Sequence, residues 1–380
     1  MKIAFLGSRG IPARYSGFET FYEQISIRLA KRGHQVTVYN RSNFITDIKG
    51  SYEGIRIVSL PSIATKHLDT ITHTFLSTLH SIFESYDIVY YCIVGNSPLA
   101  WIPKILGCKT LLNVDGEDWA REKWSGFASW YQKRCERIAT KTADVIIADA
   151  QAVRARYRDL FNMEPVFVPY GANILRDNKT DLLEKWKLIP RKYLLYVGRL
   201  VPENAADVLI KAYKQLKTQM NLVILGDAPY VENYKFRLRE LADRRVIFTG
   251  YAFGQEYVQL SSHAYLYIQP SSVEGTRPAI LDQMGFGNCV LVRGNNANRE
   301  VVGDCGIVFD GANPVENLRN KLKELLANSE IVNEYREKAR SRIIGYYNWE
   351  WITSFYEDLF LRLKNKGALI SYDEYITQVR

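Results

Sequence analysis

The feature that most restricts the fold of this chain is an alternation of short apolar runs with helical segments, which begins twice. The first series of runs indicates buried strands at Lys2–Leu6, Gln35–Tyr39, Asp87–Ile93, Thr110–Val114 and Asp144–Ala148. The second series indicates strands at Tyr193–Val197, Leu222–Leu225, Val246–Phe248, Ala264–Ile268, Cys289–Val292 and Gly306–Phe309. Such alternation predicts an α/β fold with two doubly wound parallel sheets.

The length of 380 residues also favours two domains over one core. We predict Rossmann-like domains at residues 1–167 and 168–348, facing one another across a cleft. Residues 349–380 are expected to cross back to the N-terminal domain, because aromatic and acidic residues alternate at helical spacing over Trp349–Leu363. The polar tail Lys364–Arg380 is expected to fray or to pack late.

The composition limits the classes of binding partner but does not decide among them. The formal charge of +9 suits an anionic partner: nucleic acid, a phospholipid surface or a phosphorylated small molecule. No apolar run reaches the ~18 residues of a membrane span, and the first strand is too short for a signal peptide. The five cysteines lie far apart without C-x-x-C pairs, which favours a reducing cytoplasm and argues against a metal site.

Two segments of the first half carry unusual chemistry. The loop Gly7–Gly17 is glycine-rich and leads through Glu19 into a helix, so its backbone N–H groups suit an anion; a flexible turn is the alternative. Carboxylates crowd the segment Asn113–Trp119, where at most one or two are expected to face the cleft and capping of the following helix by Asp118 is the alternative. The stretch Trp119–Arg134 interleaves aromatic and basic residues, as expected of a helix on anionic lipid or of a core helix with a solvated face.

The second half places polar residues directly after its strands, where doubly wound sheets bind ligands. Arg199 is set to fork onto a phosphate, and glycine-containing strand ends carry Asp227 and Tyr251. The sharpest segment is Pro270–Gly287, in which Glu274 and Asp282 stand at either end of a glycine-containing turn and a helix start. This turn offers amides to a diphosphate, and a carboxylate in the helix can accept hydrogen bonds from paired sugar hydroxyls.

This arrangement resembles the E-x7-E motif of retaining GT-B glycosyltransferases, of the family 4-like group. The resemblance extends over nearly the whole chain. The opening L-G-S-R-G-I-P-A-R-Y-S-G-F-E-T-F and the stretch D-G-E-D-W-A-R-E-K-W are similar to bacterial rhamnosyltransferases of polysaccharide assembly. The segments Y-V-G-R-L-V-P-E-N and N-R-E-V-V-G-D-C-G-I-V-F complete the match.

The resemblance implies roles for individual residues. Asp115 would line the acceptor side near the reacting centre, Arg199 would bind the diphosphate, and Glu274 would contact the donor sugar. Gly17 would approach the donor phosphates while Glu19 holds its loop, and Asp282 would face the ribose. The remaining donor-binding residues implied are Asp227, Tyr251, Gly275, Thr276 and Arg277.

Two departures from the family pattern affect this site. Asn204 stands where the family commonly has a lysine, so Arg277 is expected to supply the missing cation. The second acid is Asp282, one methylene shorter than the glutamate of the motif.

The activity implied is transfer of a hexosyl or deoxyhexosyl group, such as rhamnosyl, from a nucleoside-diphosphate sugar with retention of configuration. The acceptor would be a saccharide or a polyprenyl-linked saccharide. No metal or separate cofactor is expected, nor a nucleic-acid partner; the protein would be cytoplasmic, with peripheral contact to the anionic inner face of the membrane. The alternatives are a GT-B sugar-nucleotide epimerase and a non-enzymatic basic scaffold for lipid or nucleic acid.

Overall fold

The computed structural model describes residues 1–14, 16–65, 68–114, 126–228, 231–273 and 276–379. It divides into two compact units: residues 1–170 together with 349–380, and residues 171–348. The division thus falls between Tyr170 and Gly171 rather than between residues 167 and 168, and the C-terminal segment belongs to the first unit. Both units are Rossmann-like α/β domains.

The first unit is built on a sheet in the order β3-β4-β2-β1-β5-β6-β7-β8, in which only β3 runs antiparallel to its neighbour. The strands are β1 (Lys2–Leu6), β2 (Gln35–Arg41), β3 (Gly50–Tyr52), β4 (Ile55–Leu60), β5 (Ile88–Cys92), β6 (Lys109–Val114), β7 (Val145–Ala148) and β8 (Val166–Phe167). In register, Ala4 lies beside Thr37 of β2, and Phe5 lies beside Tyr90 of β5. The central strands are buried, as expected when helices cover both faces of a parallel sheet.

The connections of the first unit fall on two faces of this sheet. Its helical elements are α1 (Gly17–Lys31), α2 (Asp69–Ser81), η1 (Val94–Leu99), η2 (Pro103–Leu106), α3 (Phe127–Thr142), α4 (Gln151–Phe161), α12 (Trp349–Lys364) and α13 (Tyr372–Val379). The step from β1 to β2 runs opposite to the steps from β4 through β8. Since such crossovers are right-handed, α1 covers one face, and α2, η1, η2, α3 and α4 cover the other.

Helix α12 packs beside α1 and brings aromatic rings to the core. The ring centroids of Phe21 and Tyr356 lie 5.3 Å apart, and the hydroxyls of Tyr90 and Tyr356 lie 3.2 Å apart. Of the two alternatives for the tail, fraying is wrong for α13, because its Tyr372 and Ile376 are buried. These two side chains are one helical turn apart, so even a polar segment gains an apolar edge that packs.

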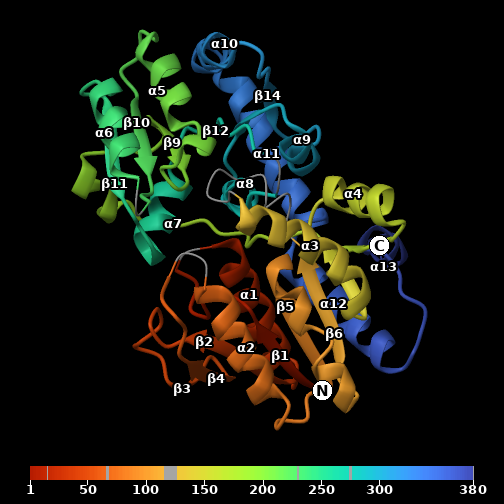
Figure 1. Ribbon diagram of the computed structural model, residues 1–380. Helices are drawn as coiled ribbons and strands as arrows, with labels where there is room; N and C mark the ends of the chain where they lie inside the picture. The colour runs from red at the N-terminus through yellow and green to blue at the C-terminus, as the bar shows by residue number, and fades with distance from the viewer. Residues whose placement is uncertain (15, 66–67, 115–125, 229–230, 274–275, 380) are drawn as a thin grey trace. The chain divides into compact units, whose positions relative to one another are not determined.

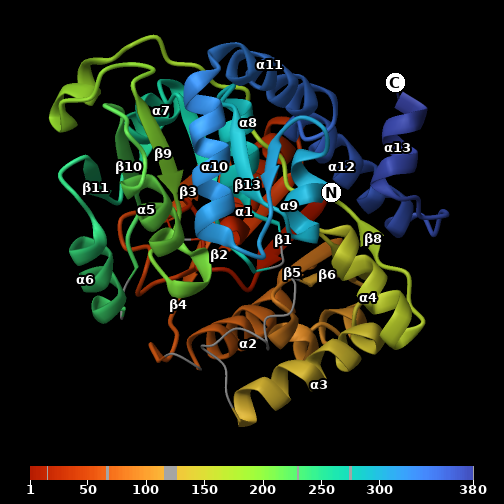
Figure 2. The ribbon, with the colours of Figure 1, turned by 90° about the horizontal axis from the view of Figure 1, so that it is seen from above.

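The second unit carries a parallel sheet in the order β11-β10-β9-β12-β13-β14. Its strands are β9 (Tyr193–Val197), β10 (Asn221–Leu225), β11 (Val246–Gly250), β12 (Leu266–Gln269), β13 (Val290–Arg293) and β14 (Ile307–Phe309). Its helices are η4 (Asp181–Trp186), η5 (Pro202–Asn204), α5 (Ala206–Lys214), α6 (Glu232–Leu241), α7 (Gly254–Ser262), α8 (Pro278–Gly285), α9 (Asn296–Val302), α10 (Pro314–Ala327) and α11 (Ser329–Gly345). Helices α5 and α10 pack side by side over the apolar core of this unit (Figures 1 and 2).

Candidate donor site in the second unit

The strand order of the second unit reverses between β9 and β12. From β9 the chain proceeds outward through β10 and β11, and from β12 it proceeds the other way through β13 and β14. Doubly wound folds bind ligands beyond the carboxyl ends of the strands at such a reversal. Arg199 follows β9 and Ser271 follows β12, each two residues past its strand. The topology therefore brings the two strongest motifs of the second half to one place.

The loops after β9, β10 and β11 are bonded to each other through their backbones. Gly198 donates its N–H to the carbonyl of Leu225 at 3.0 Å, and Gly226 donates to the carbonyl of Gly250 at 2.9 Å. At Gly226 φ is +135°, and a Cβ there would stand 2.0 Å from the carbonyl oxygen of Gly198, so only glycine fits this approach. The result is one continuous rim. It carries the predicted residues Arg199, Asp227 and Tyr251.

Asn204 connects the two arginines of the site. Its side-chain nitrogen donates to the carbonyl of Arg199 at 2.8 Å, and its side-chain oxygen accepts from Nη1 of Arg277 at 3.2 Å. Asn204 is buried, with 7% of its surface exposed. The residue that replaces the family's lysine thus carries no charge itself but fixes the position of a neighbouring guanidinium.

Ser271 and Val273 also accept from Arg277, and Asn295 in turn binds Val273; none of these three contacts was predicted from the sequence. Nη2 of Arg277 donates to the hydroxyl of Ser271 and to the carbonyl of Val273, the latter at 3.0 Å. Ser271 is fully buried and donates to the carbonyl of Glu203 at 2.8 Å. The amide of Asn295, two residues past β13, donates to the carbonyl of Val273 at 3.1 Å. Ser271 and Asn295 each lie two residues after a strand, and this position is the sequence signal that could have identified them.

Asp282 lies in the second turn of α8 and faces α7. The hydroxyl of Tyr257, on α7, donates to Oδ2 of Asp282 at 3.4 Å. Burial raises the pKa of Asp282 to about 7, although the hydrogen bond from Tyr257 lowers it. The carboxyl group can therefore donate or accept a hydrogen bond near neutral pH. Its contact with a ribose stays a prediction.

The other predicted residues of the second unit occupy differing environments. Asp227 forms an ion pair with Lys235 at 2.9 Å; burial tends to raise the pKa of Asp227, but Lys235 and the Ala228 amide hold it below its usual value. The ring of Tyr251 is 47% exposed and stacks on Phe253, with centroids 5.8 Å apart. Thr276 is partly buried beside Arg277, which is the N-cap of α8.

Three of the predicted site residues lie outside the described part of the chain. They are Asp115, Glu274 and Gly275. Within the described ranges, no group of three or more His, Cys, Asp or Glu side chains is arranged to hold a metal ion.

In the first unit, the sheet reverses between β1 and β5, and the glycine-rich loop follows β1 at that edge. Glu19 is buried, and its carboxylate accepts from the Arg14 amide at 3.1 Å and from the Ser16 hydroxyl at 3.4 Å. Glu23 accepts from the Ala13 amide at 3.0 Å. Carboxylates thus bind two of the amides that the sequence suggested for phosphate. Gly17 opens α1, with Ser16 as its N-cap.

Comparison with known proteins relates each unit to a family. Residues 191–328 match the family of glycosyl transferases group 1, and residues 78–173 match a domain of unknown function. An uncharacterized glycosyltransferase of Methanocaldococcus jannaschii is 26% identical over 62% of this chain and 63% of its own length, so the chain spans less than two thirds of that relative.

A second relative and a solved structure cover nearly the whole chain. A GDP-mannose-dependent alpha-(1-6)-phosphatidylinositol monomannoside mannosyltransferase of Mycolicibacterium smegmatis is 23% identical over 92% of this chain and 95% of its own. The structure of HepE from Anabaena with UDP and glucose has a TM-score of 0.79 and 17% identity, covering 94% of this chain and 98% of that one. The chain has the two-domain GT-B fold of glycosyltransferases, and its second unit matches the group 1 glycosyl transferase family.

Proposed function

We propose that this protein is a retaining glycosyltransferase that uses a nucleoside-diphosphate sugar. It would transfer a hexosyl or deoxyhexosyl group, rhamnosyl among them, to a saccharide or polyprenyl-linked saccharide. The observation that carries the proposal is the pair Arg199 and Arg277, joined through Asn204 at the reversal of the second sheet. The relatives support it, since the mycobacterial one is GDP-mannose-dependent and HepE was solved with UDP.

In the proposed reaction, negative charge develops on the leaving diphosphate, and the site residues would act by stabilising it. The bond between the anomeric carbon and the diphosphate oxygen breaks, and a bond to the acceptor hydroxyl oxygen forms on the same face. The acceptor proton passes to an oxygen of the leaving diphosphate. Arg199, Arg277 and the N–H of Ala279, the first that α8 offers because Pro278 has none, would stabilise this charge, which is usually the largest contribution of a preorganised site.

The remaining residues would orient the substrates. Glu274, with the amides of Gly275 and Thr276, would contact the donor sugar and its phosphates, and Asp115 would lie near the acceptor. Asp282 and the rim residues Asp227 and Tyr251 would bind the nucleoside. In this proposal the donor is the only small molecule required, and no separate cofactor takes part.

A panel of UDP-, dTDP- and GDP-sugars tests the function and identifies the base. Thermal unfolding would be followed with each nucleotide sugar, and the matching nucleoside monophosphate serves as the control for the diphosphate. We expect one nucleotide to raise the unfolding temperature, and the Arg277→Ala protein to lose that shift. NMR of the product would then report the anomeric configuration. Stabilisation by no nucleotide, or an inverted product, would contradict the proposal or its stereochemistry respectively.

The epimerase and scaffold alternatives are not favoured by these comparisons. Turnover of the donor without any acceptor, giving an isomeric nucleotide sugar, would be the result that brings the epimerase back.

A further inference from the structure

Helix α2 of the first unit is oriented with its polar side chains inward. The buried residues of this helix are polar: Asp69, His73, Thr74, Ser77, Thr78 and Ser81. The large apolar residues on and beside it are exposed, from 37% for Leu76 to 87% for Phe83: Leu68, Phe75, Leu76, Leu79 and Phe83. We call these five residues the apolar stripe. Leu68, Phe75, Leu79 and Phe83 follow one another at steps of seven, four and four, and Leu76 lies three residues before Leu79. These steps place them along one face of the helix, the reverse of an ordinary surface helix.

Hydrogen bonds fix this orientation. Asp69 accepts from Nη1 of Arg41 at 2.5 Å and from the hydroxyl of Ser62 at 2.6 Å. His73 donates from Nε2 to the carbonyl of Asn40 at 3.1 Å, and burial lowers its pKa to about 4, so it stays neutral. Turning the apolar stripe inward would break these buried bonds, each of which costs ~1–3 kcal/mol when a partner is lost. The stripe is therefore a permanent part of the surface.

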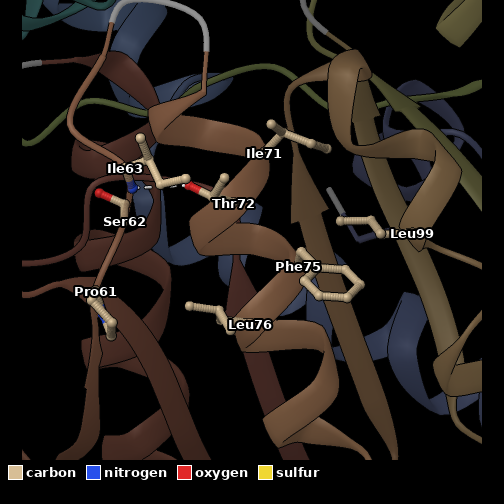
Figure 3. A pocket seen from close by; sticks show the side chains of 8 residues that line it. All are labelled: Pro61, Ser62, Ile63, Ile71, Thr72, Phe75, Leu76 and Leu99. Carbon is tan, nitrogen blue, oxygen red and sulfur yellow. Dashed lines mark hydrogen bonds between the residues drawn. The ribbon is translucent and has the colours of Figure 1, made fainter.

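A hollow lies beside the stripe and extends the apolar surface. It has a volume of about 520 Å³. Pro61 and Ile63, which follow β4, line one side, Phe75 and Leu99 line the other, and Leu76 lies between them (Figure 3). Ile63 is 53% exposed. Apolar surface of this extent on a folded protein usually marks an interaction site.

The neighbouring helix α3 exposes a basic face. Its exposed residues recur at helical spacing, and four of them are cations: Trp130, Lys133, Arg134, Arg137 and Lys141. We call these the basic stripe. The guanidinium of Arg134 lies 5.5 Å from the centre of the Trp130 ring. The nearby acid Glu136 is buried and paired with Arg156 at 2.9 Å, so it does not offset the exposed cations.

The two stripes face the same side of the unit. Element η1 packs against both α2 and α3, and all three cover the same face of the sheet. Figure 2 shows α2 and α3 next to each other on that side. Residues exposed on elements of one layer point away from the sheet in a common direction. An apolar stripe and a basic stripe thus form one surface.

We propose that this surface docks on an anionic phospholipid bilayer, with the apolar stripe in the acyl boundary and the basic stripe at the headgroups. Exposed apolar side chains next to lysine, arginine and tryptophan have the composition of an interfacial element. A second copy of the chain fits less well, because a self-complementary contact would bring the four cations of each copy together. No helix in the described ranges is long and apolar enough to cross a bilayer.

The proposal rests on the proposed function in one respect: docking on the bilayer would bring the protein to a lipid-linked acceptor. Its test uses flotation of the full chain with vesicles of phosphatidylglycerol and phosphatidylcholine, and needs no sugar transfer. The Phe75→Gln/Leu79→Gln and Lys133→Gln/Arg137→Gln proteins are each expected to need about tenfold more lipid for half-maximal binding. Binding should also weaken with salt and with phosphatidylcholine alone.

Matched controls lie in the second unit. Ile189→Gln/Ile344→Gln removes two exposed apolar side chains, and Lys217→Gln/Lys323→Gln removes two exposed cations; both should bind vesicles like the parent. Circular dichroism checks that each variant is folded. The inference is overturned if the parent does not float with anionic vesicles, or if both classes of stripe variant float unchanged. It is also overturned if the Phe75→Gln/Leu79→Gln change abolishes a dimer seen by ultracentrifugation without affecting flotation. Transfer to a soluble acceptor, measured in parallel, separates these outcomes from failure of the proposed function.

Discussion

The two sheets reverse their strand order in the same way, yet the chemistry at the two reversals is opposite. In the second unit, the guanidinium of Arg277 donates hydrogen bonds to an amide oxygen, a hydroxyl and a carbonyl, all of which are neutral groups. In the first unit, the carboxylates of Glu19 and Glu23 bind the loop amides. One topology can therefore build both a cationic edge suited to a diphosphate and an edge whose loop is fixed by acids.

The largest effect is expected from removing a guanidinium at the cationic edge. Arg199→Ala or Arg277→Ala should lower kcat by about 10²–10³-fold, the range found when a preorganised donor to a developing anion is lost. The unfolding temperature of each variant should stay close to that of the parent. Initial rates and unfolding temperatures of both variants would be measured beside Lys323→Ala, an exposed cation on α10. Unchanged turnover in Arg199→Ala would remove that residue from the site.

The next effect concerns Asp282, the partly buried acid of α8. Because burial raises the pKa of Asp282 to about 7, the folded state holds a proton there that the unfolded chain releases near pH 4. Stability should therefore fall as pH rises from about 4 to 7. Asp282→Asn should be more stable than the parent at pH 8, by about 2–4 kcal/mol, and similar at pH 4.

Urea unfolding of both proteins at the two pH values measures this difference. Equal pH dependence in parent and variant would show that Asp282 ionises normally. If Asp282 also binds the nucleoside, the stabilised variant should bind the donor more weakly, so its gain in stability would accompany a loss of function.

A smaller effect is expected from the link between the arginines. Asn204→Ala removes the acceptor of Arg277 and the donor to the Arg199 carbonyl, and should lower kcat/KM for the donor about tenfold, equivalent to ~1.4 kcal/mol. Asn204→Asp restores the acceptor and should recover part of the rate. In an Arg277→Ala background, Asn204→Ala should add little. Full additivity of the two changes would argue that Asn204 does not act through Arg277.

The smallest effect should appear at the acidic edge of the first unit. Glu19→Gln keeps the size of the side chain but weakens its hydrogen bonds to the loop, and should lower the free energy of unfolding by ~1 kcal/mol. Donor affinity should be unchanged. The exposed Glu53→Gln is the control. If Glu19→Gln lowered donor affinity as much as Arg277→Ala does, the two edges would not differ in donor binding as proposed.

Much of this architecture could be predicted from sequence, because strands buried on both faces are continuous apolar runs. Those runs gave Lys2–Leu6 and Tyr193–Val197 with the bounds of β1 and β9. The hairpin of β3 and β4 and the short β8 were missed, since they are short and partly exposed. Helix α2 was not predicted either. Its buried residues are polar, so apolar residues at helical spacing do not mark its buried face as they do in most surface helices.

The site was predictable in part for a similar reason. Position after a strand identified Arg199, and the adjacent turn identified Arg277. The connections made by Asn204, Ser271 and Asn295 were not predictable, because three loops distant in sequence must first fold onto each other to create them. The same holds for the pKa of Asp282, which depends on the packing of α7 against α8 rather than on its sequence neighbours.

The return of the chain to its first unit at Trp349 has a consequence for how the protein is made. Phe21 and Tyr90 are translated early, but the rings of Trp349 and Tyr356 that pack against them are translated only after the whole second unit. The second unit, contiguous from residue 171 to 348, has all its strands before then. On the ribosome, therefore, residues 171–348 can finish folding while the first unit still lacks α12 and α13, so that its aromatic core stays open. A nascent chain stalled before residue 349 would be expected to expose that core to chaperones.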